Sequence, residues 1–124
     1  VQVPARFQFE KNAGEFYSTV FHELTHSTGA KKRLDRLTNG AESRFGKTEY
    51  SKEELTAELG AAGMLSLLGI ETESTFTNST AYIQGWLKAL KNDNRLIVSA
   101  STKAEKAIRY IFNGKETETA KAVS

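Results

Sequence analysis

The chain of 124 residues contains no cysteine, one proline and only two histidines. The lack of cysteine excludes disulfides and thiolate metal sites, so any metal ion must be held by histidine and carboxylate side chains. No run approaches the roughly 18 apolar residues that cross a bilayer, and no signal peptide is visible. We therefore expect a cytoplasmic protein that does not associate with membranes.

The charge balance is nearly even. A formal net charge of +2 is too small to indicate nucleic-acid binding as the main role. The densest basic run, KKRLDR at Lys31–Arg36, is short and interrupted by Asp35, so it is either a solvated loop or a minor contact with phosphate. The composition and length are those of one ordinary globular domain.

The spacing of apolar residues predicts a mainly α fold. Residues Val1–Phe9 hold the only proline and suit a short edge strand, which would make the class α+β. Apolar residues recur at helical spacing in four further segments, which we expect to be helices. These segments are residues 14–28, 51–68, 81–90 and 94–113.

Two polar segments are expected to connect these helices. Lys31–Tyr50 contains two glycines, and Glu71–Thr80 is rich in threonine and serine. After residue 113 the chain has almost no large apolar residue. The expected organisation is therefore one domain at residues 1–113 and a disordered tail at residues 114–124.

Both histidines stand in one short stretch, FHELTH at Phe21–His26. On a helix, positions i and i+4 share a face about 6 Å apart, so His22 and His26 can reach one ion. Glu23 points about 100° away around the axis, where its carboxylate can hold water beside a metal without ligating it. This His-Glu-x-x-His arrangement is typical of zinc hydrolases. The alternative is two histidines that share a helix face without a metal.

A catalytic zinc site of this kind needs a third protein ligand, which here must be a carboxylate. Glu54 and Glu58 share a face of the second predicted helix with Ala61, so both are expected to point toward the core. Buried carboxylates are costly unless they are paired or bind a metal. Ser51 and Glu54 also fit a capping box, which would explain Glu54 but not Glu58. We favour Glu54 as the ligand, with Glu58 as the alternative.

Three blocks of the sequence together resemble a known family. FHELTHSTGAKKRL, YSKEELTAELGAA and AYIQGWLKALKNDNR are similar to the C-terminal metallopeptidase domain of ArdC-type antirestriction proteins, which is related to the polyvalent-protein metallopeptidases of plasmids and mobile elements. The blocks cover roughly Phe7 to Asn113. The resemblance implies a zincin-like core, in which the helix with the histidines packs on the helix with Glu54. It also implies protection of incoming plasmid DNA from host restriction. ArdC-type proteins bind single-stranded DNA through an N-terminal domain that these residues do not match.

The resemblance also bears on the third ligand. In glutamate zincins the third ligand is commonly the first residue of the pattern Glu-x-x-Ala-Asp/Asn-x-x-Ala, and Glu54, Ala57, Glu58 and Ala61 match this pattern. Glu58 stands where aspartate or asparagine is usual. The match implies that Glu54 ligates the metal and that Glu58 orients a ligating histidine.

We therefore expect a zinc-dependent peptidase that acts on a protein or peptide substrate. His22, His26 and Glu54 would hold the zinc, and Glu23 would take the proton of the attacking water. Another donor would bind the carbonyl oxygen. Tyr82 is the first candidate for it, although its spacing also suits a core residue.

Two further expectations accompany this interpretation. Tyr50 is the second candidate for the donor, and part of Lys31–Tyr50 should border the metal.

The competing hypothesis is a module that binds DNA or protein without proteolysis, with a structural or vestigial metal site. The presence of Glu23 favours the peptidase, because a structural site needs no general base.

Overall fold

The computed structural model describes residues 13–36 and 47–113. Within them the chain forms four helices and no strand, which confirms the mainly α prediction. The helices are α1 (Ala13–Ser27), α3 (Lys47–Leu67), α4 (Glu73–Ala89) and α5 (Asn94–Asn113). The strand expected at residues 1–9 and the tail expected at residues 114–124 lie outside the described residues. None of the described helices has both the length and the hydropathy needed to cross a membrane.

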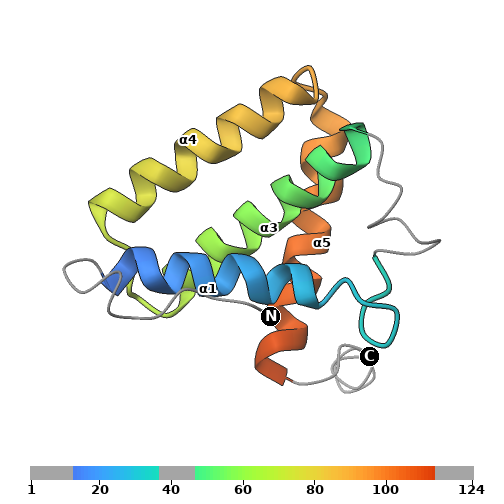
Figure 1. The fold of residues 1–124 in the computed structure, drawn as a ribbon. Helices are drawn as coiled ribbons and strands as arrows, with labels where there is room; N and C mark the ends of the chain where they lie inside the picture. The colour runs from blue at the N-terminus through green and yellow to red at the C-terminus, as the bar shows by residue number, and fades with distance from the viewer. Residues whose placement is uncertain (1–12, 37–46, 114–124) are drawn as a thin grey trace.

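Helix α3 occupies the centre of the fold. The other three helices each pack against it, whereas α1 makes few contacts with α4 or α5 (Figure 1). Because α3 has neighbours on several sides, apolar and small residues cover most of its circumference. Its buried apolar residues are Leu55, Ala57, Ala61, Met64 and Leu65.

Helices α1 and α3 approach each other closely at Gly60. A Cβ atom built on Gly60 would lie only 2.6 Å from the Oγ1 atom of Thr25. Thr25 is fully buried, and its hydroxyl donates a hydrogen bond to the Phe21 carbonyl at 2.8 Å. The distance between packed helices depends on the side chains at their contact. The absence of a side chain at Gly60 therefore brings the histidine-bearing helix close to α3.

The first turn of α3 differs from the prediction. The helix begins at Lys47, so Ser51 lies in its second turn and is buried there. The capping-box interpretation of Ser51 and Glu54 is therefore wrong, because a cap stands at the first turn of a helix. Near the start of α3, Lys52 forms an ion pair with Glu49, and the Lys52 Nζ atom lies 3.0 Å from the Glu49 Oε1 atom.

Helix α4 also begins earlier than predicted. Most of the expected connector Glu71–Thr80 is helical, because Thr72 caps a helix that begins at Glu73. The Thr72 hydroxyl accepts a hydrogen bond from the Thr75 amide at 3.1 Å, and the Thr75 hydroxyl accepts one from the Thr72 amide at 2.8 Å. A capping box usually has glutamate or glutamine at the position of Thr75, so the sequence pattern concealed this helix start.

An apolar cluster joins α3 to α4 and α5. Buried Leu55, Leu90 and Ala100 form its centre. Five partly buried residues pack around them, namely Leu59, Ile83, Trp86, Leu87 and Leu96. Trp86 thus contributes to the core. Tyr82 does not, because it is 60% exposed.

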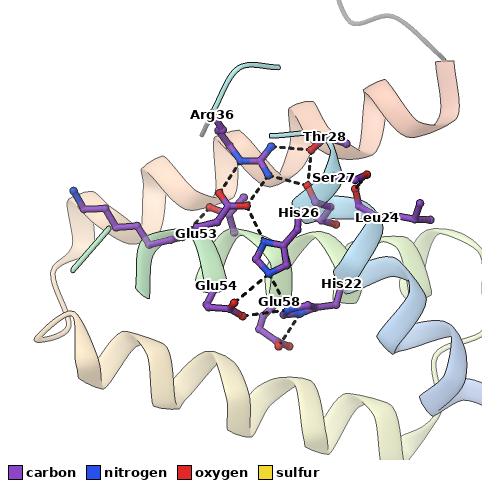
Figure 2. A network of polar contacts seen from close by, with 12 residues as sticks. His22, Leu24, His26, Ser27, Thr28, Arg36, Glu53, Glu54 and Glu58 are labelled. Atoms are coloured by element: carbon purple, nitrogen blue, oxygen red, sulfur yellow. Dashed lines mark hydrogen bonds and ion pairs between the residues drawn. The ribbon is translucent and has the colours of Figure 1, made fainter. Parts of the chain in front are cut away.

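After α1 the chain reverses direction in a compact turn. The Leu34 amide donates to the Thr28 carbonyl at 2.9 Å, and the Asp35 amide donates to the Ala30 carbonyl at 3.0 Å. Asp35 has a φ of 54°, in the left-handed region that aspartate enters more readily than most residues. The turn places Arg36 beside the contact between α1 and α3 (Figure 2).

Candidate metal centre

Two histidines of α1 meet two glutamates of α3 where these helices cross (Figure 2). The Nε2 atoms of His22 and His26 lie 3.0 Å apart. The carboxylate of Glu54 faces both, with Oε2 3.1 Å from His22 Nε2 and Oε1 3.2 Å from His26 Nε2. The side chains of the two histidines, Glu54 and Glu58 are each between 13% and 22% exposed. Three potential ligands therefore converge in a half-buried site that solvent can still reach.

The spacing of these atoms fits a small divalent ion. Four ligand atoms placed tetrahedrally about 2.0–2.1 Å from zinc lie about 3.3–3.4 Å from one another. The two Nε2 atoms lie 3.0 Å from each other and 3.1 and 3.2 Å from the Glu54 oxygens, so the observed distances are only slightly shorter. Within residues 13–36 and 47–113, His22, His26 and Glu54 are the one group of three such side chains whose ligand atoms all lie within 4.8 Å of one another.

A further carboxylate faces the outer nitrogen of each imidazole. His22 Nδ1 lies 3.0 Å from Glu58 Oε1, and His26 Nδ1 lies 2.9 Å from Glu53 Oε2. A ring that donates its Nδ1 proton to a carboxylate presents the Nε2 lone pair to a metal. Both rings therefore have the orientation that ligation through Nε2 requires. Glu58 lies on the outer side of His22, away from the shared centre.

Arg36 connects the outer end of this network to α1. Its guanidinium donates to both oxygens of Glu53, from Nε at 2.9 Å and from Nη2 at 2.8 Å. It also donates to the Thr28 hydroxyl and to the Thr25 carbonyl, each at 2.8 Å. The side chains of Arg36 and Glu53 are only 7% and 9% exposed. The interpretation of KKRLDR as a solvated loop is therefore wrong for Arg36.

Sequence reasoning missed the parts played by Glu53 and Arg36. Glu53 immediately precedes Glu54, about 100° away around the helix, so it falls outside the stripe that drew attention to Glu54 and Glu58. Its burial depends on α1 and on Arg36, which is 17 residues away in the sequence. The neighbouring sequence, Lys52 before it and Glu54 after it, gave no indication that Glu53 would be buried as well.

The carboxylates strongly perturb the titration of the histidines in the metal-free chain. Burial by itself lowers the pKa of His22, but hydrogen bonds and charge interactions with Glu54 and Glu58 raise it to about 10. Burial likewise opposes the charged form of His26, yet Glu53 and Glu54 raise its pKa to about 9. The pKa of Glu54 falls to about 2, because its bonds to both histidines outweigh the effect of burial. Protons and a metal ion therefore compete for the same imidazoles.

The structure also places the other residues proposed for catalysis. Glu23 is half-buried on α1 and forms no hydrogen bond or ion pair with another described residue. Tyr82 lines a cavity of about 210 Å³ between α1 and α4, which His22 and Glu58 also line. Tyr50 lies in the first turn of α3, one turn before Glu54. The charge of Glu54, followed by burial and a hydrogen bond to Glu54, raises the pKa of its hydroxyl.

Comparisons with known proteins agree with this geometry. Residues 1–103 match a family model described as a zincin-like metallopeptidase. The uncharacterized protein y4eC of Sinorhizobium fredii is 39% identical over 105 residues, which cover 85% of this chain and 33% of y4eC. A DNA primase TraC of Escherichia coli is 38% identical over 112 residues, which cover 90% of this chain and 10% of TraC. The chain thus spans a third or less of these relatives.

A solved structure is also similar. The crystal structure of the antirestriction protein ArdC from the R388 plasmid, in its Mn(II)-bound form, matches with a TM-score of 0.66. The two sequences are 41% identical, and the match covers 90% of this chain and 39% of ArdC. At this identity the likeness extends beyond the arrangement of the helices to the sequence itself.

Proposed function

The chain belongs to the zincin-like metallopeptidase family, and from this premise we propose that it is the zinc-dependent peptidase domain of an antirestriction protein of plasmids or mobile elements. The observation that carries the proposal is the convergence of two imidazole Nε2 atoms and one carboxylate, with each Nδ1 atom facing a further carboxylate. This arrangement orients both rings for ligation before any ion binds.

His22, His26 and Glu54 would hold the ion. Two imidazoles and one carboxylate form a ligand set that catalytic zinc sites use. Zinc also binds such ligands more tightly than manganese(II), the ion in the related ArdC structure. A divalent ion held there would lower the pKa of water and polarise a peptide carbonyl.

Glu23 is the proposed general base. It follows His22 directly on α1, and its carboxylate has no hydrogen-bond or ion-pair partner among the described residues. In this role it would accept a proton from water and pass it to the leaving amine. Tyr82 is the proposed donor to the carbonyl oxygen, because its exposed side chain lines the cavity that reaches His22.

The position of Glu58 favours the peptidase over a structural metal site. A structural zinc site is closed by four protein ligands, whereas a catalytic site keeps one position open. Glu58 faces Nδ1 of His22 and not the shared centre, so it does not supply a fourth ligand in this arrangement. Because the chain spans a small part of its relatives, we assign to it only the peptidase step. We propose that DNA binding belongs to a separate N-terminal domain of a longer protein.

The test combines metal analysis with cleavage of an unfolded protein substrate. Wild-type protein should bind one zinc ion per chain and cleave the substrate, and a chelator should stop the cleavage. Glu23→Gln should retain zinc and lose cleavage, because the amide cannot accept the proton. Glu54→Ala should lose both, whereas Glu49→Ala, on the exposed side of the same helix, should lose neither.

Two results would contradict this assignment. Loss of zinc in Glu23→Gln would show that Glu23 ligates the metal. A wild-type chain that binds zinc but cleaves no unfolded protein would favour the alternative, a module that binds DNA or protein through a structural or vestigial site.

A further inference from the structure

We infer that Arg36 is a positioning residue for His26, which it controls through Glu53, and that the two histidines of the site are therefore held in unequal ways. The inference rests on the proposed metal site and adds to it a residue from the turn after α1. Arg36 itself touches neither histidine in the contacts described above. It reaches the His26 ring through the carboxylate of Glu53, which contacts both Arg36 and His26.

The support of His26 is rigid. Glu53 accepts hydrogen bonds from Arg36 at both of its oxygens, and Oε2 also faces His26 Nδ1. Arg36 is in turn held by two acceptors at the end of α1, the Thr25 carbonyl in its last turn and the hydroxyl of Thr28, which directly follows the helix. A bidentate pair between guanidinium and carboxylate fixes the plane of the carboxylate as well as its position. The ring of His26 is thus fixed by a chain of contacts that begins and ends on α1.

The support of His22 lacks such a cation. Among the described residues, the carboxylate of Glu58 pairs with His22 alone. Glu58 also lines the cavity between α1 and α4, so its environment is more open than that of Glu53. The surroundings of the two histidines therefore differ in charge. Glu53, beside His26, is neutralised by the guanidinium of Arg36, whereas Glu58, beside His22, has no such cation among the described residues.

Removal of the guanidinium would have two opposing effects on His26. The remaining carboxylate would attract the Nδ1 proton more strongly, which makes the imidazole a better ligand. However, Glu53 would lose both bonds that fix its plane, and a buried carboxylate without its cation turns toward solvent. Because Glu53 is almost fully buried, we expect the loss of position to dominate.

The experiment measures the zinc dissociation constant by chelator competition in four variants of the full chain. Arg36→Met should weaken binding about 10–100-fold, the usual effect of removing an outer partner of a ligand. Arg33→Met is the matched control, because exposed Arg33 also donates to the end of α1, at the Ser27 carbonyl, but does not reach Glu53. It should leave the constant unchanged. Glu53→Gln should also weaken zinc binding. The double variant Arg36→Met/Glu53→Gln should bind zinc no more weakly than whichever single variant has the larger effect, because both act through the same contact.

A second readout separates positioning from general loosening. The chain has only two histidines, so ¹⁵N-histidine labelling of the zinc-loaded protein reports on two rings. In Arg36→Met the Nδ1 proton of one ring should exchange faster with water while the other stays unchanged. Glu58→Gln should accelerate the exchange of the other ring.

Each result decides the inference. It is overturned if Arg36→Met binds zinc as tightly as wild type or more tightly, or if the exchange of both Nδ1 protons rises together. If circular dichroism shows that Arg36→Met does not fold, Glu53→Gln takes its place in the test. The inference is then overturned if Glu53→Gln binds zinc as tightly as wild type, or if the exchange of both Nδ1 protons rises together. A wild-type chain that binds no zinc would refute the metal site itself. Weakened zinc binding without any peptidase activity in the wild type would support the inference and refute only the proposed hydrolysis.

Discussion

Replacing Gly60 with alanine should force α1 away from α3 at the metal site. The new Cβ atom would lie 2.6 Å from Thr25 Oγ1 and 2.7 Å from Thr25 Cγ2. Thr25 cannot turn aside easily, because it is fully buried and its hydroxyl is bonded to the Phe21 carbonyl. The backbone of α1 must therefore move, and His22 and His26 would move with it.

The magnitude follows from two opposing contributions. An extra methyl group in a packed interior costs about 1–3 kcal/mol, and two contacts far below van der Waals distance place this one at the upper end. Alanine in a helix recovers about 0.5–1 kcal/mol relative to glycine. The net loss in the free energy of unfolding should thus be about 2 kcal/mol. For a domain of this size, that lowers Tm by about 8 °C.

The assay is thermal unfolding of the metal-free chain, combined with zinc titration. Gly85→Ala provides the control, because Gly85 lies within α4 and a Cβ atom there meets nothing within 4 Å. The control should be slightly more stable than wild type, and Gly60→Ala should be less stable and should bind zinc more weakly. Thr25→Ala combined with Gly60→Ala should recover part of the loss. If Gly60→Ala were as stable as Gly85→Ala, the close approach of α1 to α3 would be refuted.

Three further predictions concern titration, catalysis and zinc binding. In the metal-free chain, the pKa values of His22 and His26 lie above the ordinary 6.5, so their stabilisation is complete below pH 6.5 and is lost as the pH rises through about 9 and about 10. Melts in chelator should therefore show Tm falling above neutral pH, and an unchanged Tm would contradict this. Tyr82→Phe should lower kcat about 10²–10³-fold without loss of zinc, as expected for a donor to the carbonyl oxygen. Tyr50→Phe should instead weaken zinc binding, because its hydroxyl bonds to Glu54.

Local geometry explains which parts of the site could be predicted from the sequence. The spacing of His22 and His26, and that of Glu54 and Glu58, fixes a shared face on each helix without reference to the rest of the fold. The packing of α1 on α3 then brings the two faces together. The catalytic and ligand roles of these side chains are proposals that the mutations above test.

Two features of the structure, the burial of Glu53 and the start of α4, could not be predicted from the spacing of apolar residues. The burial of Glu53 depends on Arg36, and nothing in the run KKRLDR distinguishes its last residue from the exposed Lys31 and Lys32. The start of α4 was missed for a different reason, since a threonine at Thr75 completes a cap that usually requires a longer side chain. In both cases a short polar stretch acquires its structure from partners that periodicity does not reveal.

The net charge of the ionisable side chains at the contact of α1 and α3 favours a bound ion with a charge of +2. The cluster contains three carboxylates, one guanidinium and two imidazoles, on Glu53, Glu54, Glu58, Arg36, His22 and His26. With neutral imidazoles, the single guanidinium leaves two of the three negative charges uncompensated. Two protons on the imidazoles cancel this charge, and so would one divalent cation. A monovalent ion would leave a half-buried negative charge, which is costly. The same cluster can therefore exchange two protons for one dication without a change in its net charge.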